Sequence, residues 1–145
     1  MKKNDCRHAI IAGCSRVGAE IASMLSSKGK DVVVLDNNKL SFRKLSPDYS
    51  GFTVEADATD VDALKQAGIE KADLLVAATN DDNTNIMIAQ IASKLFQVPR
   101  VISRLYDYEK EVVYNDYNVQ IIYPTRLTLH QFEQLISEHH REGSR

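Results

Sequence analysis

The sequence lacks three features that would narrow its class directly: a long apolar run, a set of paired cysteines and a strong net charge. A membrane-spanning helix needs roughly 20 consecutive apolar residues, and no stretch of the chain approaches that length. The first residues lead into an apolar run typical of a strand, not into a signal peptide, so we expect a cytoplasmic protein without direct membrane insertion. The formal net charge of −2 gives no electrostatic reason to expect nucleic acid as a partner.

The two cysteines, Cys6 and Cys14, are too few for a disulfide framework. They lie before and after a predicted strand, and a rise of about 3.3 Å per residue separates them by about 25 Å. We therefore expect no disulfide within the chain. At 145 residues, with 43% hydrophobic and 26% charged residues, the chain has the size and composition of one globular domain.

The most informative stretch is 8–36. An apolar run over 8–12 precedes a glycine turn, a helical pattern that continues to about Lys28, and a second apolar run that ends at Asp36. The glycine turn consists of Gly13, Cys14, Ser15, Arg16, Val17 and Gly18. This order of strand, turn, helix, strand and acid is typical of a βαβ unit that binds a dinucleotide, with the diphosphate at the helix N-terminus. A carboxylate at position 36 would bind ribose hydroxyls and repel a 2′-phosphate, which favours NAD(H), ATP, ADP or AMP over NADP(H).

Two residues of the turn deserve separate interpretation. Ser15 stands where the fingerprint has a glycine, so its side chain crowds the approach of the diphosphate while offering a hydroxyl donor. Arg16 places a cation in the first helical turn, which opposes the helix dipole at a cost of roughly 0.3 to 1 kcal/mol unless an anion is bound. The alternative is a solvent-facing arginine that tolerates this cost.

The remaining sequence alternates helical and strand patterns. We predict strands over 52–56, 72–78, 99–103 and 119–122, and helices over 40–45, 60–67, 82–96 and 107–115 and from Pro124 onwards. The helix over 82–96 is predicted to be the longest and largely buried. Six strands alternating with helices predict an α/β fold: a doubly wound parallel six-stranded sheet, Rossmann-like, in the order 3-2-1-4-5-6.

In such sheets ligands bind beyond the carboxyl ends of the strands. Besides the glycine turn, the residues at these ends are Asp36, Asn37, Asp57, Ala58, Thr59, Ala78, Thr79, Asn80 and Arg104. We expect them to converge on one site. For the neighbouring Asp60 and Asp81 we favour a role as helix N-caps, which aspartate often fills.

Several of these motifs together resemble a known family. They are Gly-x-Ser-Arg-Val-Gly at 13–18, Val-Val-Leu-Asp at 33–36, Glu-Ala-Asp-Ala-Thr-Asp at 55–60, Ala-Ala-Thr-Asn at 77–80 and Ile-Ser-Arg at 102–104. This set resembles the nucleotide-binding domain of regulator-of-potassium-conductance (RCK/KTN) proteins, the cytosolic regulatory subunits of Trk and Ktr potassium transport systems. The resemblance covers 8–136, which leaves 1–7 and 137–145 as polar tails.

The resemblance implies a homodimer or larger ring that binds NAD(H) or an adenine nucleotide and gates a membrane potassium transporter or channel. It implies a diphosphate on residues 13–18, the ribose on Asp36, the adenine near Asp57 and Ala58, and further phosphate contacts at Arg16 and Arg104. Thr125 follows Pro124 where many relatives have an acid, which argues against a cation site there. The second ligand-binding domain common in the family would lie beyond the end of this sequence.

Two other functions fit parts of the sequence. Tyr106-x-x-x-Lys110 would place a phenol and an ammonium on one helical face, as in a small NAD-dependent oxidoreductase. Because Ser15 alters the fingerprint, the domain could instead be a scaffold with a vestigial pocket. We favour the regulatory sensor, which is not an enzyme, because the predicted site has no evident catalytic group.

Three local features remain. His139 and His140 are adjacent and point to different faces of a helix, so a solvated tail is favoured over a metal site. Cys14 lies near a helix N-terminus, which can lower a thiol pKa, although an inert small residue fits better. The apolar residues of the last helix, Leu127, Phe132, Leu135 and Ile136, would cover the sheet or pack against another copy of the chain.

Overall fold

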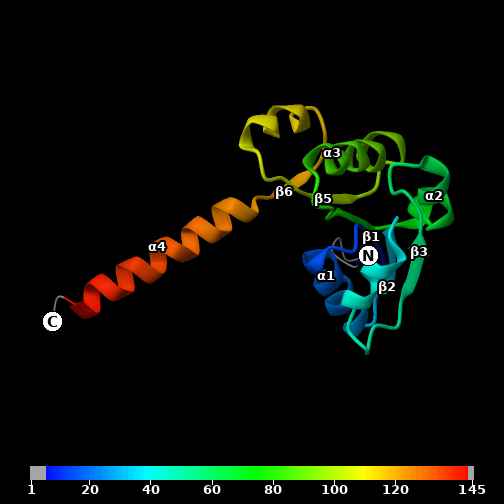
Figure 1. Ribbon diagram of the computed structural model, residues 1–145. Coiled ribbons are helices and arrows are strands. Elements are labelled where there is room, and N and C mark those ends of the chain that lie inside the picture. Colours follow the sequence, from blue (N-terminus) through cyan, green and yellow to red (C-terminus); the bar gives the residue numbers. More distant parts are fainter. Residues whose placement is uncertain (1–5, 144–145) are drawn as a thin grey trace.

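The computed structural model describes residues 6–143, with side chains through residue 138. Its centre is a six-stranded sheet in the order β3-β2-β1-β4-β5-β6, and every neighbouring pair is parallel (Figure 1). The strands are β1 (His8–Ala12), β2 (Asp31–Asp36), β3 (Phe52–Glu55), β4 (Leu74–Ala77), β5 (Arg100–Arg104) and β6 (Gln120–Ile122). The predicted Rossmann-like fold and strand order are confirmed.

Helices of three types connect the strands or follow the last one. The α-helices are α1 (Arg16–Ser27), α2 (Val61–Gln66), α3 (Asp82–Gln90) and α4 (Pro124–Gly143). The 3₁₀ segments are η1 (Lys39–Lys44), η2 (Ile69–Lys71) and η4 (Tyr108–Tyr114), and η3 (Ile91–Leu95) is a π-helix that continues α3.

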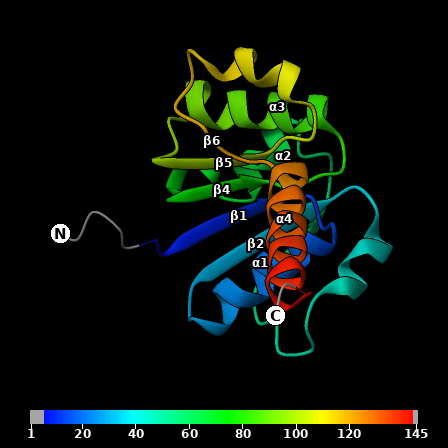
Figure 2. The same ribbon diagram turned by 90° about the vertical axis from the view of Figure 1, so that its left-hand side faces the viewer.

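Alternate residues of the central strands point to opposite faces of the sheet. Ile10 and Ala12 of β1 pack in a core with α2 and α3, whereas Ala9 and Ile11 pack in a second core with α1. Figure 2 shows α1 and α3 on opposite sides of the sheet. Because both faces are covered, the strands are continuous apolar runs and not alternating ones.

Two predicted helices, 40–45 and 107–115, form as the 3₁₀ segments η1 and η4. Each begins at a side-chain cap: Leu40 N–H donates to Asn38 Oδ1 (3.1 Å) and Glu109 N–H donates to Asp107 Oδ1 (3.0 Å). Both segments are short, and η1 buries no residue fully. With little packing to stabilise an α-helical turn, the tighter 3₁₀ form suffices.

The prediction that the helix over 82–96 is the longest and largely buried is wrong. The regular helix α3 has 9 residues, and α4 has 20. Only one stripe of α3 and η3, with Ile88, Ala89 and Ala92, faces the sheet, while the side chains of Met87 and Leu95 are 50% and 60% exposed. Apolar residues around the whole circumference therefore do not imply burial here.

Helix α4 extends away from the sheet (Figure 1). Its apolar side chains Leu127, Leu129, Phe132, Leu135 and Ile136 are each more than half exposed, so α4 does not cover the sheet of its own chain. The helix runs without a break across position 137, where the sequence predicts the start of a tail. The side chains of His139 and His140 lie outside the described residues. Over residues 6–143, no helix is both long and apolar enough to cross a membrane.

Candidate functional site

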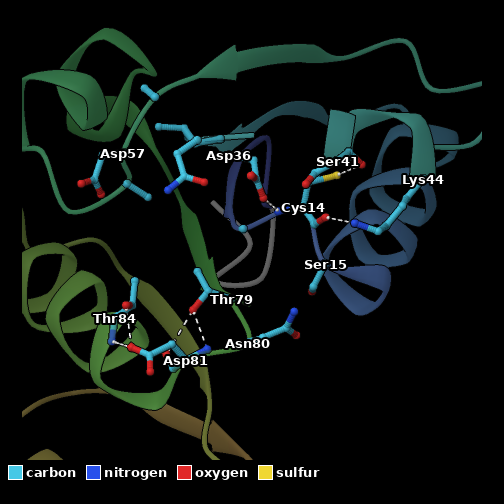
Figure 3. Close-up of a pocket in the computed structure, with 15 residues that line it drawn as sticks. Cys14, Ser15, Asp36, Ser41, Lys44, Asp57, Thr79, Asn80, Asp81 and Thr84 are labelled. Carbon is cyan, nitrogen blue, oxygen red and sulfur yellow. Dashed lines mark hydrogen bonds between the residues drawn. The ribbon is translucent and has the colours of Figure 1, made fainter. Parts of the chain in front are cut away.

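A cavity of about 350 Å³ opens at the carboxyl ends of the strands, where the strand order reverses between β1 and β4 (Figure 3). Its size falls in the range of ligand sites in proteins. The lining residues are Gly13, Cys14, Ser15, Leu35, Asp36, Asn37, Ser41, Lys44, Ala56, Asp57, Ala58, Thr79, Asn80, Asp81 and Thr84. The cavity therefore brings together most of the predicted residues, and leaves Arg16, Val17, Gly18, Thr59, Ala78 and Arg104 outside its wall.

The two glycines of the turn allow α1 to begin close to the sheet. Gly13 has φ +110°, and a Cβ there would lie 2.7 Å from the backbone nitrogen of Thr79. A Cβ on Gly18 would lie 2.1 Å from the carbonyl oxygen of Gly13. Both positions therefore exclude side chains, as the fingerprint requires.

The start of α1 presents backbone amides without partners in the described chain. Cys14 N–H donates to Asp36 Oδ2 (2.9 Å) and Gly18 N–H donates to Ser15 Oγ (3.1 Å). The amides of Arg16 and Val17 lie in the same first turn and have no acceptor within residues 6–143. Such amides, together with the helix dipole, favour an anion at this end of the helix.

Asp36 joins the turn to the cavity. Its Oδ2 accepts from the Cys14 amide, and its Oδ1 accepts from the Asn38 amide (2.8 Å). These bonds fix the carboxylate at the end of β2, beside the turn, where it lines the cavity. Each carboxylate oxygen keeps a lone pair for a further donor, such as a ribose hydroxyl.

The Ser15 hydroxyl is used within the protein. Its Oγ donates to the carbonyl oxygen of Ala78 (2.6 Å) and accepts from Gly18 N–H. Ser15 is thus the N-cap of α1 and ties that helix to the end of β4. Since the one hydroxyl proton already has an acceptor, the structure does not place it as a donor to a ligand.

The two arginines predicted to contact phosphate lie outside the cavity wall. Arg16 is an exposed residue at the first position of α1. Arg104 is only 6% exposed, and its Nη2 donates to Ala78 O (3.1 Å), Thr79 O (2.8 Å) and Asn80 Oδ1 (2.8 Å). Arg104 is therefore placed to hold the loop after β4.

A buried amide holds the same loop from the other side. Asn85, fully buried in α3, accepts from Thr79 N–H (2.9 Å) and Thr79 Oγ1–H (2.6 Å) and donates to Thr79 O and Arg104 O. The polar positions of Thr79 and Asn80 on the cavity wall are thus fixed by side chains from α3 and β5. No motif in the sequence indicates Asn85.

The aspartates after β3 and β4 have both structural and lining roles. Asp57 Oδ1 accepts from the Thr59 hydroxyl (2.7 Å) and amide (2.9 Å), which lowers the pKa of Asp57 and keeps it ionised. Asp60 caps α2, as predicted. Asp81 caps α3 through Thr84, whose hydrogen bonds lower the pKa of Asp81, but Asp81 also lines the cavity.

Sequence reasoning missed Ser41 and Lys44 of η1. Lys44 Nζ donates to Cys14 O (3.2 Å) and Cys14 Sγ–H donates to Ser41 O (3.3 Å), so η1 lies against the glycine turn (Figure 3). Burial, followed by the charge of Asp36, raises the pKa of the Cys14 thiol, while Lys44 lowers it. The raised pKa argues against a reactive thiolate, and Cys14 forms no disulfide with Cys6.

The residue pair expected of an oxidoreductase does not form a site. Tyr106 lies before η4, and Lys110 lies within it. The guanidinium carbon of Arg104 lies 5.2 Å from the centroid of the Tyr106 ring. In a 3₁₀ helix, with three residues per turn, positions four apart do not share a face. Neither residue lines the cavity.

Over the described residues, no group of three His, Cys, Asp or Glu side chains could hold a metal ion.

Sequence comparison relates the chain to potassium transport proteins. The family model described as TrkA-N domain matches residues 9–124. The chain is 36% identical over 124 residues to the Trk system potassium uptake protein TrkA of Streptomyces coelicolor, a match that covers 86% of this chain and 56% of that protein. In six such matches this chain spans 29 to 60% of the length of the relative.

Solved structures share the fold. The TrkA-N domain of the inner membrane protein ybaL from Escherichia coli superposes with a TM-score of 0.78 at 18% identity, covering 91% of this chain and 98% of that chain. The GsuK channel bound to NAD gives a TM-score of 0.78 at 24% identity, covering 94% of this chain and 24% of that chain. At these identities the likeness shows a common fold.

Proposed function

Because the chain belongs to the TrkA-N domain family, we propose that it binds NAD(H) or an adenine nucleotide as a regulatory domain of potassium transport. One observation supports this most strongly: the Asp36 carboxylate lines the cavity together with Gly13, Cys14 and Ser15, the turn that leads directly into the unpartnered amides of Arg16 and Val17. In this proposal the amides of Arg16 and Val17 bind the diphosphate, and Asp36 binds the ribose hydroxyls. Asp57 and Ala58 lie beside the adenine, and Thr79 and Asn80 beside the remaining part of the ligand.

The domain acts as a sensor and not as an enzyme. Its ionisable lining groups are the carboxylates of Asp36, Asp57 and Asp81, the Lys44 ammonium and the Cys14 thiol. Each of these five groups makes a hydrogen bond within the protein. What remains for a ligand is the other two N–H donors of Lys44 and the unused lone pairs of the carboxylates. No paired acid and base is left for proton transfer. A ligand that binds one conformation more tightly than another would shift their populations and thereby regulate a partner.

The partner in this proposal is a membrane potassium transporter or channel, to which the domain attaches from the cytoplasmic side. The similarity to TrkA of a Trk uptake system and the fold shared with a channel support this assignment. Two nucleotides with different affinities for two conformations would set the state of the transporter.

Titration calorimetry with NADH, NAD, ATP, ADP and AMP tests nucleotide binding. We expect saturable binding of at least one of them, and affinity for NADPH at least about tenfold below that for NADH, because Asp36 repels a 2′-phosphate. Binding of none of the five would refute the proposed function. Equal affinity for NADPH and NADH would remove Asp36 from the ribose site.

We also propose that the protein is a homodimer or larger assembly, held together in part by α4. An isolated helix of this kind is marginal in water, and its apolar stripe is exposed on its own chain. Packing that stripe against a second copy would bury it.

Phe132→Asp is expected to shift the assembly to monomers, because a carboxylate in the stripe would lose its hydration on packing. Light scattering at micromolar concentration measures the mass. Ser137→Asp adds the same charge on the opposite side of α4, away from the stripe, and is expected to leave the mass unchanged. A monomeric wild-type protein would contradict this assignment.

A further inference from the structure

The cavity has an uneven distribution of charge. Its lining residues include three carboxylates, on Asp36, Asp57 and Asp81, and one cationic side chain, Lys44. Arg16 is exposed outside the wall, and the Arg104 guanidinium is engaged with oxygens of the loop after β4. A phosphate-bearing ligand at this site would therefore meet a single ammonium among the lining side chains.

Lys44 is held next to the glycine turn by the packing of its own segment. Phe42 and Leu45, on either side of it, pack against the core beneath α1, and Leu45 N–H donates to Phe42 O (3.1 Å). The Lys44 ammonium donates one hydrogen bond, to Cys14 O at 3.2 Å. The ion pair given for the described residues joins His8 and Asp31, and within this part of the chain no carboxylate lies within ion-pair distance of Lys44. Two of its three donors are thus available.

The side chain of Ser15 makes the Lys44 ammonium more important for binding a phosphate. The residue at this position of the fingerprint is a glycine because the backbone must approach the diphosphate closely, and a side chain at 15 crowds that approach. The Ser15 hydroxyl does not compensate, since it donates to Ala78 O. A flexible ammonium on the adjacent carbonyl can reach a phosphate oxygen that the amides do not approach.

We infer that Lys44 sets the preference of the site for additional phosphate groups: its ammonium leaves Cys14 O and binds a terminal phosphate of a nucleoside polyphosphate. This inference rests on the proposed nucleotide site and adds a residue that determines selectivity within it. The site then favours ATP over AMP, and the preference depends on Lys44. A charge-assisted hydrogen bond of this kind changes affinity by about tenfold.

The test compares Lys44→Met with Lys39→Met by calorimetry with ATP, AMP, NADH and NADPH. Lys39 is an exposed lysine of the same segment that does not line the cavity, so its removal changes the net charge equally. We expect Lys44→Met to lower the affinity for ATP about tenfold, to change the affinity for AMP little, and to make ATP binding less sensitive to salt. Lys44→Arg should retain the preference, and Lys39→Met should leave it unchanged.

Other results would overturn the inference. If Lys44→Met lowers the affinities for ATP and AMP equally, Lys44 only supports the glycine turn. If it lowers the affinity for NADPH alone, Lys44 lies at the ribose 2′ position. An unchanged ratio of ATP to AMP affinity, with a wild-type protein that binds both, would reject the role of Lys44 while leaving the proposed function intact. A wild-type protein that binds no nucleotide would reject both.

Discussion

Asp36→Ala is expected to weaken NADH binding by about a hundredfold, because it removes the acceptor of two ribose hydroxyls, and hydrogen bonds to a charged group contribute about 1.5 to 3 kcal/mol each. It also leaves the amides of Cys14 and Asn38 without their acceptor, which loosens the turn that approaches the diphosphate. Calorimetric titration of the variant with NADH measures the loss. An affinity equal to that of the wild type would show that the ribose lies elsewhere.

Two further variants separate the ribose contact from general effects. Asp48→Ala removes an exposed carboxylate that does not line the cavity, so we expect unchanged affinity. Asp36→Asn keeps the size of the side chain and one acceptor oxygen but removes the charge. Its affinity for NADH should fall less than that of Asp36→Ala, and its discrimination against NADPH should largely disappear.

Gly18→Ala should destabilise the domain by about 3 kcal/mol or more, because the added methyl group would overlap a backbone atom. Backbone cannot move aside as a flexible side chain can. The added Cβ would lie 2.1 Å from Gly13 O. Gly13 cannot easily move away, since its own Cα faces the backbone of Thr79. Urea unfolding followed by circular dichroism measures the change in the free energy of unfolding.

Gly29→Ala is the matched control for Gly18→Ala. Gly29 has φ +79° and nothing within 4 Å of an added Cβ, so only backbone strain opposes the substitution, at a cost of about 1 kcal/mol. If Gly18→Ala proves no more destabilising than Gly29→Ala, then Gly18 does not pack against Gly13 as closely as the distance of 2.1 Å requires.

The parts of the fold that were predictable depend on local patterns. Buried parallel strands produce continuous apolar runs, glycines mark the turn, and aspartates mark helix starts, so the strand order and the caps at Asp60 and Asp81 follow from the sequence. Asp36 could be placed for the same reason: it ends the second strand of a βαβ unit, and the structure ties it to the turn.

The parts that were not predictable depend on contacts between distant segments. Arg104 and Asn85 act on the loop after β4 from other elements, and their partners are largely backbone carbonyls and amides, which leave no trace in the sequence. Lys44 is one of several basic residues in η1, and only the fold shows that it reaches Cys14. The hydroxyl of Ser15 has a partner on β4, which the fingerprint alone could not reveal.

The most direct measurement is a crystal structure of the protein with bound NADH. We expect the diphosphate on the amides of Arg16 and Val17 and both adenosine ribose hydroxyls on the Asp36 carboxylate. A ligand seated away from the front of α1, or a ribose that does not touch Asp36, would contradict this expectation.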